Sequence, residues 1–384
     1  MDDILFQVTQ DQLETGMRGF PVGYCVTSSV DPIKGLFYRG RPISELYKWE
    51  PERILYLLLH GKEGSASDIT SFSAELKKRA HCSSAVIKHI ASLPRQGHPM
   101  KLFNAALLIL GSLEGQGDYR EDCINLMAKL PHLVAAVINY HAGWGDTKPP
   151  RDDLGYMESF AEMLNVPGGD KAHLSEVFRL FNILHYDHGG GNLSCFVGKA
   201  IASGLADMFG SICGAMCALA GPRHGKANQD CLTFVRSVLD EVGEKATAQD
   251  VEQLIRKRLE NKQLVFGFGH AVLRAEDARA TIFYDYAEEH FKDHPLVKIA
   301  TLLRTEGPKV LKENPKISNP YPNVDAMSGT ILTAAGFPYP EYYTVLFGLS
   351  RAVGIAIQIV YERLEAREGK GTPIVRPRYL YKGP

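Results

Sequence analysis

Three histidines of this chain lie in loops where glycines flank them, a setting that suits contact with a bound molecule. They are His188 in DHGGGN, His224 in GPRHGKAN and His270 in GFGHAVL. Glycine lets backbone amides approach a ligand closely, and binding groups concentrate in loops on a rigid frame. An imidazole also exchanges a proton near neutral pH. For each histidine alone, a helix cap or a hydrogen bond in the core is the ordinary alternative.

Arginines supply the positive charge that an anionic ligand requires. Arg351 interrupts the apolar run 342–361, which favours a buried core helix over a membrane span. A buried guanidinium is tolerated only with an anionic partner. Arg274 and Arg279 follow the GFGH loop closely, and Arg376 lies in VRPRYLY. Because the guanidinium fork binds carboxylates bidentately, these arginines favour a small polycarboxylate as ligand. Ion pairs with Asp or Glu of the chain are the alternative.

One aspartate has two interpretations. Asp325 stands just before an apolar helical segment, where aspartate is common as a helix N-cap. A desolvated carboxylate at this place can instead act as a general base. The chain has no Walker loop, no GxGxxG between a strand and a helix, and no GxSxG or HExxH, which excludes the enzyme classes that those motifs mark.

Composition limits the partners and the compartment. With 43 basic and 44 acidic residues, the net charge of −1 argues against nucleic acid or a membrane as partner. The seven scattered cysteines indicate reduced thiols, and no cluster at metal-ligand spacing predicts a metal site. The first ten residues resemble neither a secretory signal nor an organelle-targeting segment. We therefore expect a cytoplasmic protein without a metal.

The elements that must position these residues are nearly all helical. Alternating residues predict only a short hairpin, 23–29 with 36–39, around the turn DPIKG. Pro131 predicts a break or kink in its helix. Thr247 with Asp250 resembles a capping box, and Asp277 can cap the helix that follows it. Helical periodicity and capping signals predict an all-α fold with helices at about 51–60, 100–113, 124–140, 170–186, 195–220 (with a possible interruption), 247–257, 278–291, 325–336 and 341–367.

A set of strings in fixed order carries a family resemblance. The chain resembles the citrate synthase family over about 35–381, particularly the branch that includes the mitochondrial enzyme. The strings are GLFYRGRPISEL (35–46), DHGGGN (187–192), LAGPRHGKANQ (219–229), GFGHAVLRAEDAR (267–279), NPYPNVDAMSG (319–329), YYTVLFGLSRAVG (342–354) and VRPRYLY (375–381).

The resemblance implies a two-domain helical homodimer that closes on its substrates. Residues 1–224 and 331–384 would form the large domain, and residues 225–330 the small one. The implied reaction is a Claisen-type condensation of acetyl-CoA with oxaloacetate, without cofactor or metal. Closure would shield the reaction intermediate from side reactions.

The resemblance also assigns roles to single residues. The catalytic groups would be His224, His270 and Asp325. Oxaloacetate would be held by His188, Arg279, Arg351 and Arg376 of the partner subunit. Coenzyme A would contact Gly267, Phe268, Gly269 and Arg274.

Three alternatives remain at this stage. A 2-methylcitrate synthase would take propionyl-CoA, and one methylene is worth only about 1–3 kcal/mol in an apolar pocket. The same enzyme could run the reaction backwards as a citrate cleavage route. A non-catalytic helical homologue would keep the fold alone. Lys226 departs from the family pattern beside His224, where its charge could lower the pKa of the histidine.

Overall fold

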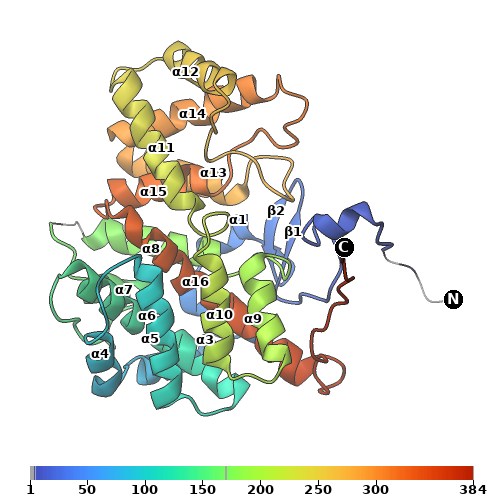
Figure 1. Ribbon diagram of the computed structural model, residues 1–384. Coiled ribbons are helices and arrows are strands. Elements are labelled where there is room, and N and C mark those ends of the chain that lie inside the picture. The colour runs from blue at the N-terminus through green and yellow to red at the C-terminus, as the bar shows by residue number, and fades with distance from the viewer. Residues whose placement is uncertain (1–3, 5, 169–170, 384) are drawn as a thin grey trace.

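The computed structural model describes residues 4, 6–168 and 171–383, and it is built from helices with one small sheet (Figure 1). The predicted all-α class is therefore confirmed. The helices before residue 225 are α1 (Ile43–Leu46), α2 (Pro51–His60), α3 (Ala66–Arg79), α4 (Ser84–Ile90), α5 (Pro99–Glu114), α6 (Tyr119–Ala142), α7 (Tyr156–Met163), α8 (Lys171–His185), α9 (Leu193–Ser203) and α10 (Met208–Leu219). Those after it are α11 (Ala227–Val242), α12 (Ala248–Glu260), α13 (Ala278–Phe291), α14 (Pro295–Leu311), α15 (Asp325–Ala334) and α16 (Tyr343–Val360). Shorter helical turns are η1 (Asp11–Glu14), η2 (Pro340–Tyr342) and the π-helical η3 (Tyr361–Glu365).

The predicted hairpin is present and belongs to a three-stranded antiparallel sheet. Its strands are β1 (Ser28–Asp31), β2 (Gly35–Tyr38) and β3 (Arg41–Pro42), in that order. The Asp31 carboxylate accepts the backbone N–H groups of Ile33 and Lys34 at 2.8 and 2.7 Å, which closes the turn. Gly35 completes the turn at a φ of +85°. The first strand begins later than the predicted Gly23.

The long apolar helix α16 forms the centre of the core. It packs on α5, α6, α8, α9 and α10, and every one of its residues except Phe347 is buried. Within the described residues, α6 and the run Pro340–Glu365 are long and apolar enough to cross a membrane. However, 83% and 94% of their apolar windows are buried inside the protein. This burial agrees with the prediction of a core helix at 342–361.

Several predicted boundaries need correction. Helix α6 continues through Pro131 without a break, because its surroundings are buried and compensate for one missing backbone hydrogen bond. The predicted helix 195–220 is two helices, since Leu205 adopts a φ of +64° and Asp207 caps the start of α10. The predicted start at Asp170 lies outside the described residues.

Two sequence-based caps are confirmed. Thr247 and Asp250 form a reciprocal capping box at the start of α12. The Asp277 side chain caps α13 by accepting the N–H of Arg279. This second cap matters for function because it fixes the helix that follows the GFGH loop.

The helices α11–α15 gather at one end of the molecule (Figure 1), where they pack on one another. Helix α15 also contacts α8, and α11 contacts α16, so this group adjoins the core helices. Whether residues 225–330 form a separate domain stays a prediction.

Candidate active site

The loop after α8 and the loop before α13 meet at two histidines. The ring centroids of His188 and His270 lie 5.2 Å apart. The Nε2 atom of His188 is buried and has no hydrogen-bond partner among the described residues. Burial, and then the charges of Arg279 and Arg351, hold the pKa of His188 well below its usual value. This imidazole is therefore neutral, with one polar atom left for a ligand.

Glycine is required where the GFGH loop crosses α15. Gly267 has a φ of +84°, and a Cβ there would lie 2.9 Å from both Ala326 Cα and Cys231 Sγ. Gly269 is also left-handed, with a φ of +83°. Phe268 stands between them, and its ring covers Gly307 so closely that a Cβ on that glycine would clash. The loop is thus packed onto its neighbours in one conformation.

Asn323 ties this loop to the start of α15. Its Nδ2 donates to the Gly269 carbonyl at 3.0 Å, and its Oδ1 accepts the N–H of Asp325 at 3.0 Å. The Asn323 N–H donates to the Gly267 carbonyl at 2.9 Å. His270 and Asp325 are therefore held on one rigid unit. Sequence reasoning missed Asn323, although an asparagine two residues before Asp325 is a recognisable capping signal.

The interpretation of Asp325 as a helix N-cap is wrong. Val324 occupies the N-cap position, and Asn323 accepts the hydrogen bond of the first N–H group of α15. The Asp325 carboxylate therefore does not cap the helix. Among the described residues no group donates a hydrogen bond to this carboxylate. Burial raises its pKa to about 6, with Arg279 opposing and Asp277 reinforcing the rise. A carboxylate of this pKa is ionised at neutral pH and is a stronger base than an ordinary aspartate.

The backbone fixes the tautomer of His270. Its Nδ1 accepts the N–H groups of Val272 and Leu273, each at 3.0 Å. Burial and then the charge of Arg279 lower the pKa of His270 to about 4, so the ring is neutral. Its single proton must therefore be on Nε2, which becomes a hydrogen-bond donor.

His224 is fixed in the opposite tautomer. Its Nε2 accepts the N–H of Ser194 at 3.3 Å and lies 2.9 Å from the Ser194 Oγ. Burial and then Arg351 lower its pKa to about 4. The neutral ring therefore carries its proton on Nδ1. Ser194, the second residue of α9, was missed by sequence reasoning.

Lys226 pairs with Asp230 at 3.4 Å and is not among the causes that lower the pKa of His224.

The two buried arginines differ in their partners. Arg351 is 2% exposed, and among the described residues no carboxylate lies within ion-pair distance. Its Nε donates to the His185 carbonyl at 3.0 Å, and its guanidinium lies 4.8 Å from the Phe347 ring centroid. Arg279 instead binds Asp277 bidentately, at 3.0 and 2.7 Å. The ion-pair alternative thus applies to Arg279, while the guanidinium of Arg351 lacks an anion.

The remaining predicted binding residues lie at the surface. Arg274 is exposed, and its Nη1 folds back onto the carbonyls of its own loop, at 2.7 Å from the Leu273 oxygen. Arg376 is exposed and makes no hydrogen bond or ion pair with the described residues of its own chain. The structure therefore brings together His188, His224, His270, Asp325, Arg279 and Arg351, and leaves Arg376 apart from them.

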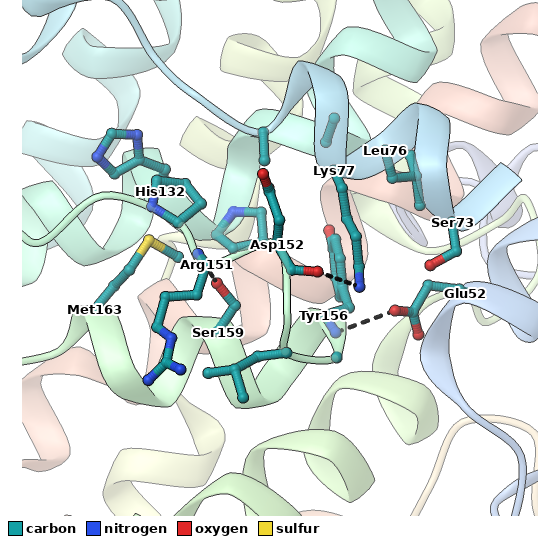
Figure 2. Close-up of a pocket in the computed structure, with 16 residues that line it drawn as sticks. Glu52, Ser73, Leu76, Lys77, His132, Arg151, Asp152, Tyr156, Ser159 and Met163 are labelled. Atoms are coloured by element: carbon teal, nitrogen blue, oxygen red, sulfur yellow. Dashed lines mark hydrogen bonds between the residues drawn. The ribbon is translucent and has the colours of Figure 1, made fainter. Parts of the chain in front are cut away.

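A hollow elsewhere on the protein is not this site. Figure 2 shows a small pocket, partly open to solvent, that is lined by residues of α2, α3, α6, α7 and the loop before α7. Within it Lys77 donates to the Asp152 carbonyl at 2.7 Å, and Glu52 accepts the N–H of Tyr156 at 3.1 Å. These groups satisfy backbone atoms at helix ends, and none belongs to the cluster described above.

Comparison with known proteins agrees with this geometry. The family model for the citrate synthase C-terminal domain matches residues 16–378. The chain is 36% identical to the mitochondrial citrate synthase of Citrus maxima, over 97% of this chain and 83% of the relative. It is 37% identical to that of Daucus carota, with the same coverage.

Solved structures give the same result. The citrate synthase of Pyrobaculum aerophilum matches with a TM-score of 0.83 at 28% identity, over 96% of this chain and 92% of the other. The enzyme of Thermoplasma acidophilum, solved as a ternary complex with carboxymethyl coenzyme A and oxaloacetate, matches with a TM-score of 0.81 at 25% identity, over 96% of each chain.

The prediction of a cytoplasmic location is wrong, since the curated relatives named here and two of Arabidopsis thaliana are mitochondrial enzymes by name. The prediction relied on unpaired thiols and on the first ten residues. All seven cysteines are indeed free, but free thiols indicate only a reducing environment, which does not single out the cytoplasm.

The family match covers nearly the whole chain, and the matched segments are those that bring the histidines, Asp325 and Arg351 together. This protein is a member of the citrate synthase family.

Proposed function

We propose that this chain is an acyltransferase that condenses acetyl-CoA with oxaloacetate and water to give citrate and coenzyme A. The single observation that carries the proposal is the convergence of two neutral imidazoles and a carboxylate of raised pKa on the two buried guanidinium groups, with His224 beside Arg351 and with His270 and Asp325 beside Arg279. The proposed chemistry needs no metal or prosthetic group.

The first step is removal of a methyl proton from acetyl-CoA. Asp325 takes this proton. The pKa of its carboxyl group is raised and so lies closer to the pKa of the weakly acidic methyl group of the thioester, which makes the transfer less unfavourable. The negative charge then develops on the thioester oxygen. His224 stabilises it through the proton on Nδ1, because Ser194 occupies Nε2.

The second step is attack of the enolate carbon on the oxaloacetate ketone. His270 donates its Nε2 proton toward the ketone oxygen, which makes the carbonyl carbon more electrophilic. The new carbon–carbon bond leaves the ketone oxygen as an alkoxide, which takes the His270 proton and gives citryl-CoA. Water then cleaves the thioester to citrate and coenzyme A. Protons from water and from Asp325 protonate the thiol and restore His270, and the remaining one leaves to solvent.

The oxaloacetate carboxylates would be held by Arg351, Arg279 and His188. Arg351 gains the anion that its burial demands, and His188 uses its free Nε2. Arg376 of the partner subunit would complete the clamp in a homodimer. The segment that follows supports such an interface, since Tyr379 and Tyr381 are each 92% exposed.

Coenzyme A would bind along the GFGH loop. The backbone of Gly267, Phe268 and Gly269 would contact its pantetheine and adenine parts. Arg274 sits at the exposed rim, where its guanidinium meets only carbonyl oxygens and is available to phosphate. Residues 225–330 would act as a small domain that closes this loop over the substrates.

The test of this proposal is release of the coenzyme A thiol from acetyl-CoA and from propionyl-CoA, each with and without oxaloacetate. We expect oxaloacetate-dependent release that is faster with acetyl-CoA. Faster release from propionyl-CoA would indicate 2-methylcitrate synthesis. No oxaloacetate-dependent release from either would contradict the enzyme and leave a non-catalytic homologue.

The variant Asp325→Asn separates catalysis from stability. We expect turnover to fall by about 10²–10⁴-fold, the usual contribution of a general base, with little change in oxaloacetate affinity.

The same variant has an expected effect on stability. The pKa of Asp325 is raised in the folded state, so the wild-type protein loses stability as the pH rises from about 4 to above 6. The variant avoids this loss and should be more stable at pH 8 by up to about 3 kcal/mol, and by less at pH 5. Urea unfolding at both pH values measures this difference, and near-normal turnover would show that another group is the base.

The variant Arg376→Ala tests the shared site. We expect oxaloacetate to bind about 10- to 100-fold more weakly, the usual cost of one charge-assisted hydrogen-bonding partner, with folding and dimerisation unchanged. Arg378→Ala removes the same charge from the same segment and is the matched control. Equal losses in both variants would assign the effect to net charge and contradict a direct contact.

A further inference from the structure

A buried carboxylate stands directly behind His188 without a cation partner. Asp187 is fully buried, and among the described residues no Lys, Arg or His lies within ion-pair distance of it. Its carboxylate accepts hydrogen bonds from Thr27, from Ser28 at 2.8 Å and from the His188 N–H at 2.9 Å. A further donor is Gln358, whose Nε2 lies 2.8 Å from Oδ1. Four donors thus stabilise the charge and fix the backbone at His188.

The orientation of the Gln358 amide is fixed from its other side. Lys199 Nζ donates to the Gln358 Oε1 at 3.3 Å and pairs with Glu362 at 2.8 Å. An ammonium group can only donate, so Oε1 must face Lys199 and Nε2 must face Asp187. The same Nε2 also approaches the Gly189 carbonyl at 3.3 Å. The amide therefore holds both the residue before His188 and the residue after it.

This contact needs the close approach of α16 to the loop. Arg351 and Gln358 lie seven residues apart, which is two helical turns, so they share one face of α16. Gly354 lies between them, and a Cβ there would collide with the Tyr186 carbonyl and lie 2.9 Å from Asp187 Cβ. One face of α16 thus presents both the guanidinium and the amide to the segment that ends at His188.

We infer that Gln358, oriented by the Lys199–Glu362 pair, is a positioning residue that sets His188 for binding of the oxaloacetate carboxylate. This inference rests on the proposed function. Gln358 would not touch the substrate. It acts through Asp187, whose charge it satisfies, and through the backbone of the DHGGGN loop.

The near-isosteric variant Gln358→Glu gives the sharpest test. An ionised carboxyl group there would face Asp187 as a like charge, whereas a protonated one would donate to Asp187 as the amide does. The titratable and charged groups around this position are Asp187, Lys199 and Glu362, with the thiols of Cys25 and Cys195 and the guanidinium groups of Arg39 and Arg351 farther away.

We therefore expect the KM for oxaloacetate to rise by about 10- to 100-fold at about pH 8.5 and to return toward the wild-type value near pH 6. Turnover and the KM for acetyl-CoA should change by less than about threefold. All values are taken relative to wild type at the same pH, and calorimetric binding of oxaloacetate repeats the measurement without turnover.

Two further variants control this result. Gln358→Met removes the amide without adding a charge, so its KM for oxaloacetate should be raised at both pH values alike. Asn139→Asp changes another buried amide, which bonds to Thr147 and the Met163 carbonyl in the core, and should alter stability but not the KM. If Gln358→Glu fails to fold, Lys199→Met, which frees the amide to rotate, should raise the same KM.

Three results would overturn the inference. They are a wild-type KM for oxaloacetate in Gln358→Glu at both pH values, an equal loss in the KM for acetyl-CoA, or no effect of Gln358→Met. An inactive wild-type protein would instead contradict the proposed function.

Discussion

The guanidinium of Arg351, buried in the middle of an apolar helix without a carboxylate beside it, is the constraint on which the site depends. Burial lowers its pKa, and the charge of Asp187 is the largest influence that opposes this change. The His185 carbonyl and the Phe347 ring serve the same charge from two sides. These contacts make the charge tolerable without neutralising it, so an entering carboxylate finds a desolvated cation already in place.

Burial and the neighbouring guanidinium groups together keep the imidazoles of this cluster neutral. Burial is the largest cause of the lowered pKa of His188, His224 and His270, and the charge of Arg279 or Arg351 lowers each pKa further. The rings of His224 and His270 differ in which nitrogen is free, because the backbone donates to Nε2 of His224 and to Nδ1 of His270. A neutral ring whose one proton is fixed on a known nitrogen is a hydrogen-bond donor of defined direction. The arginine charges and the backbone hydrogen bonds therefore make each ring a donor before any ligand binds, and no change in its protonation is required.

Much of this could be predicted from sequence, and the failures share a cause. Thr247 and Asp277 cap their helices as predicted, because capping is decided within four residues. Arg351 was conspicuous because a charge in an apolar run demands a partner. Ser194 and Gln358 gave no comparable signal, since their importance comes from contacts with segments distant in the chain. Asn323 offered a capping signal, but its bond to the distant Gly269 carbonyl could not be read from the sequence. The expected break at Pro131 failed for a similar reason, because tertiary burial outweighs the local loss of one hydrogen bond.

The charges within the candidate site give a reason why a second subunit would contribute a residue to it. Among the described residues, Asp277 pairs directly with the buried Arg279, whereas Asp187 opposes the charge of Arg351 only from beyond ion-pair distance. Asp325 adds a further negative charge above about pH 6. A dicarboxylate entering this cluster would bring more negative charge than the chain offsets, and desolvation would make the excess costly. Another cation would then be needed, and the exposed Arg376, which has no ion-pair partner among the described residues of its own chain, would meet that need in the proposed homodimer.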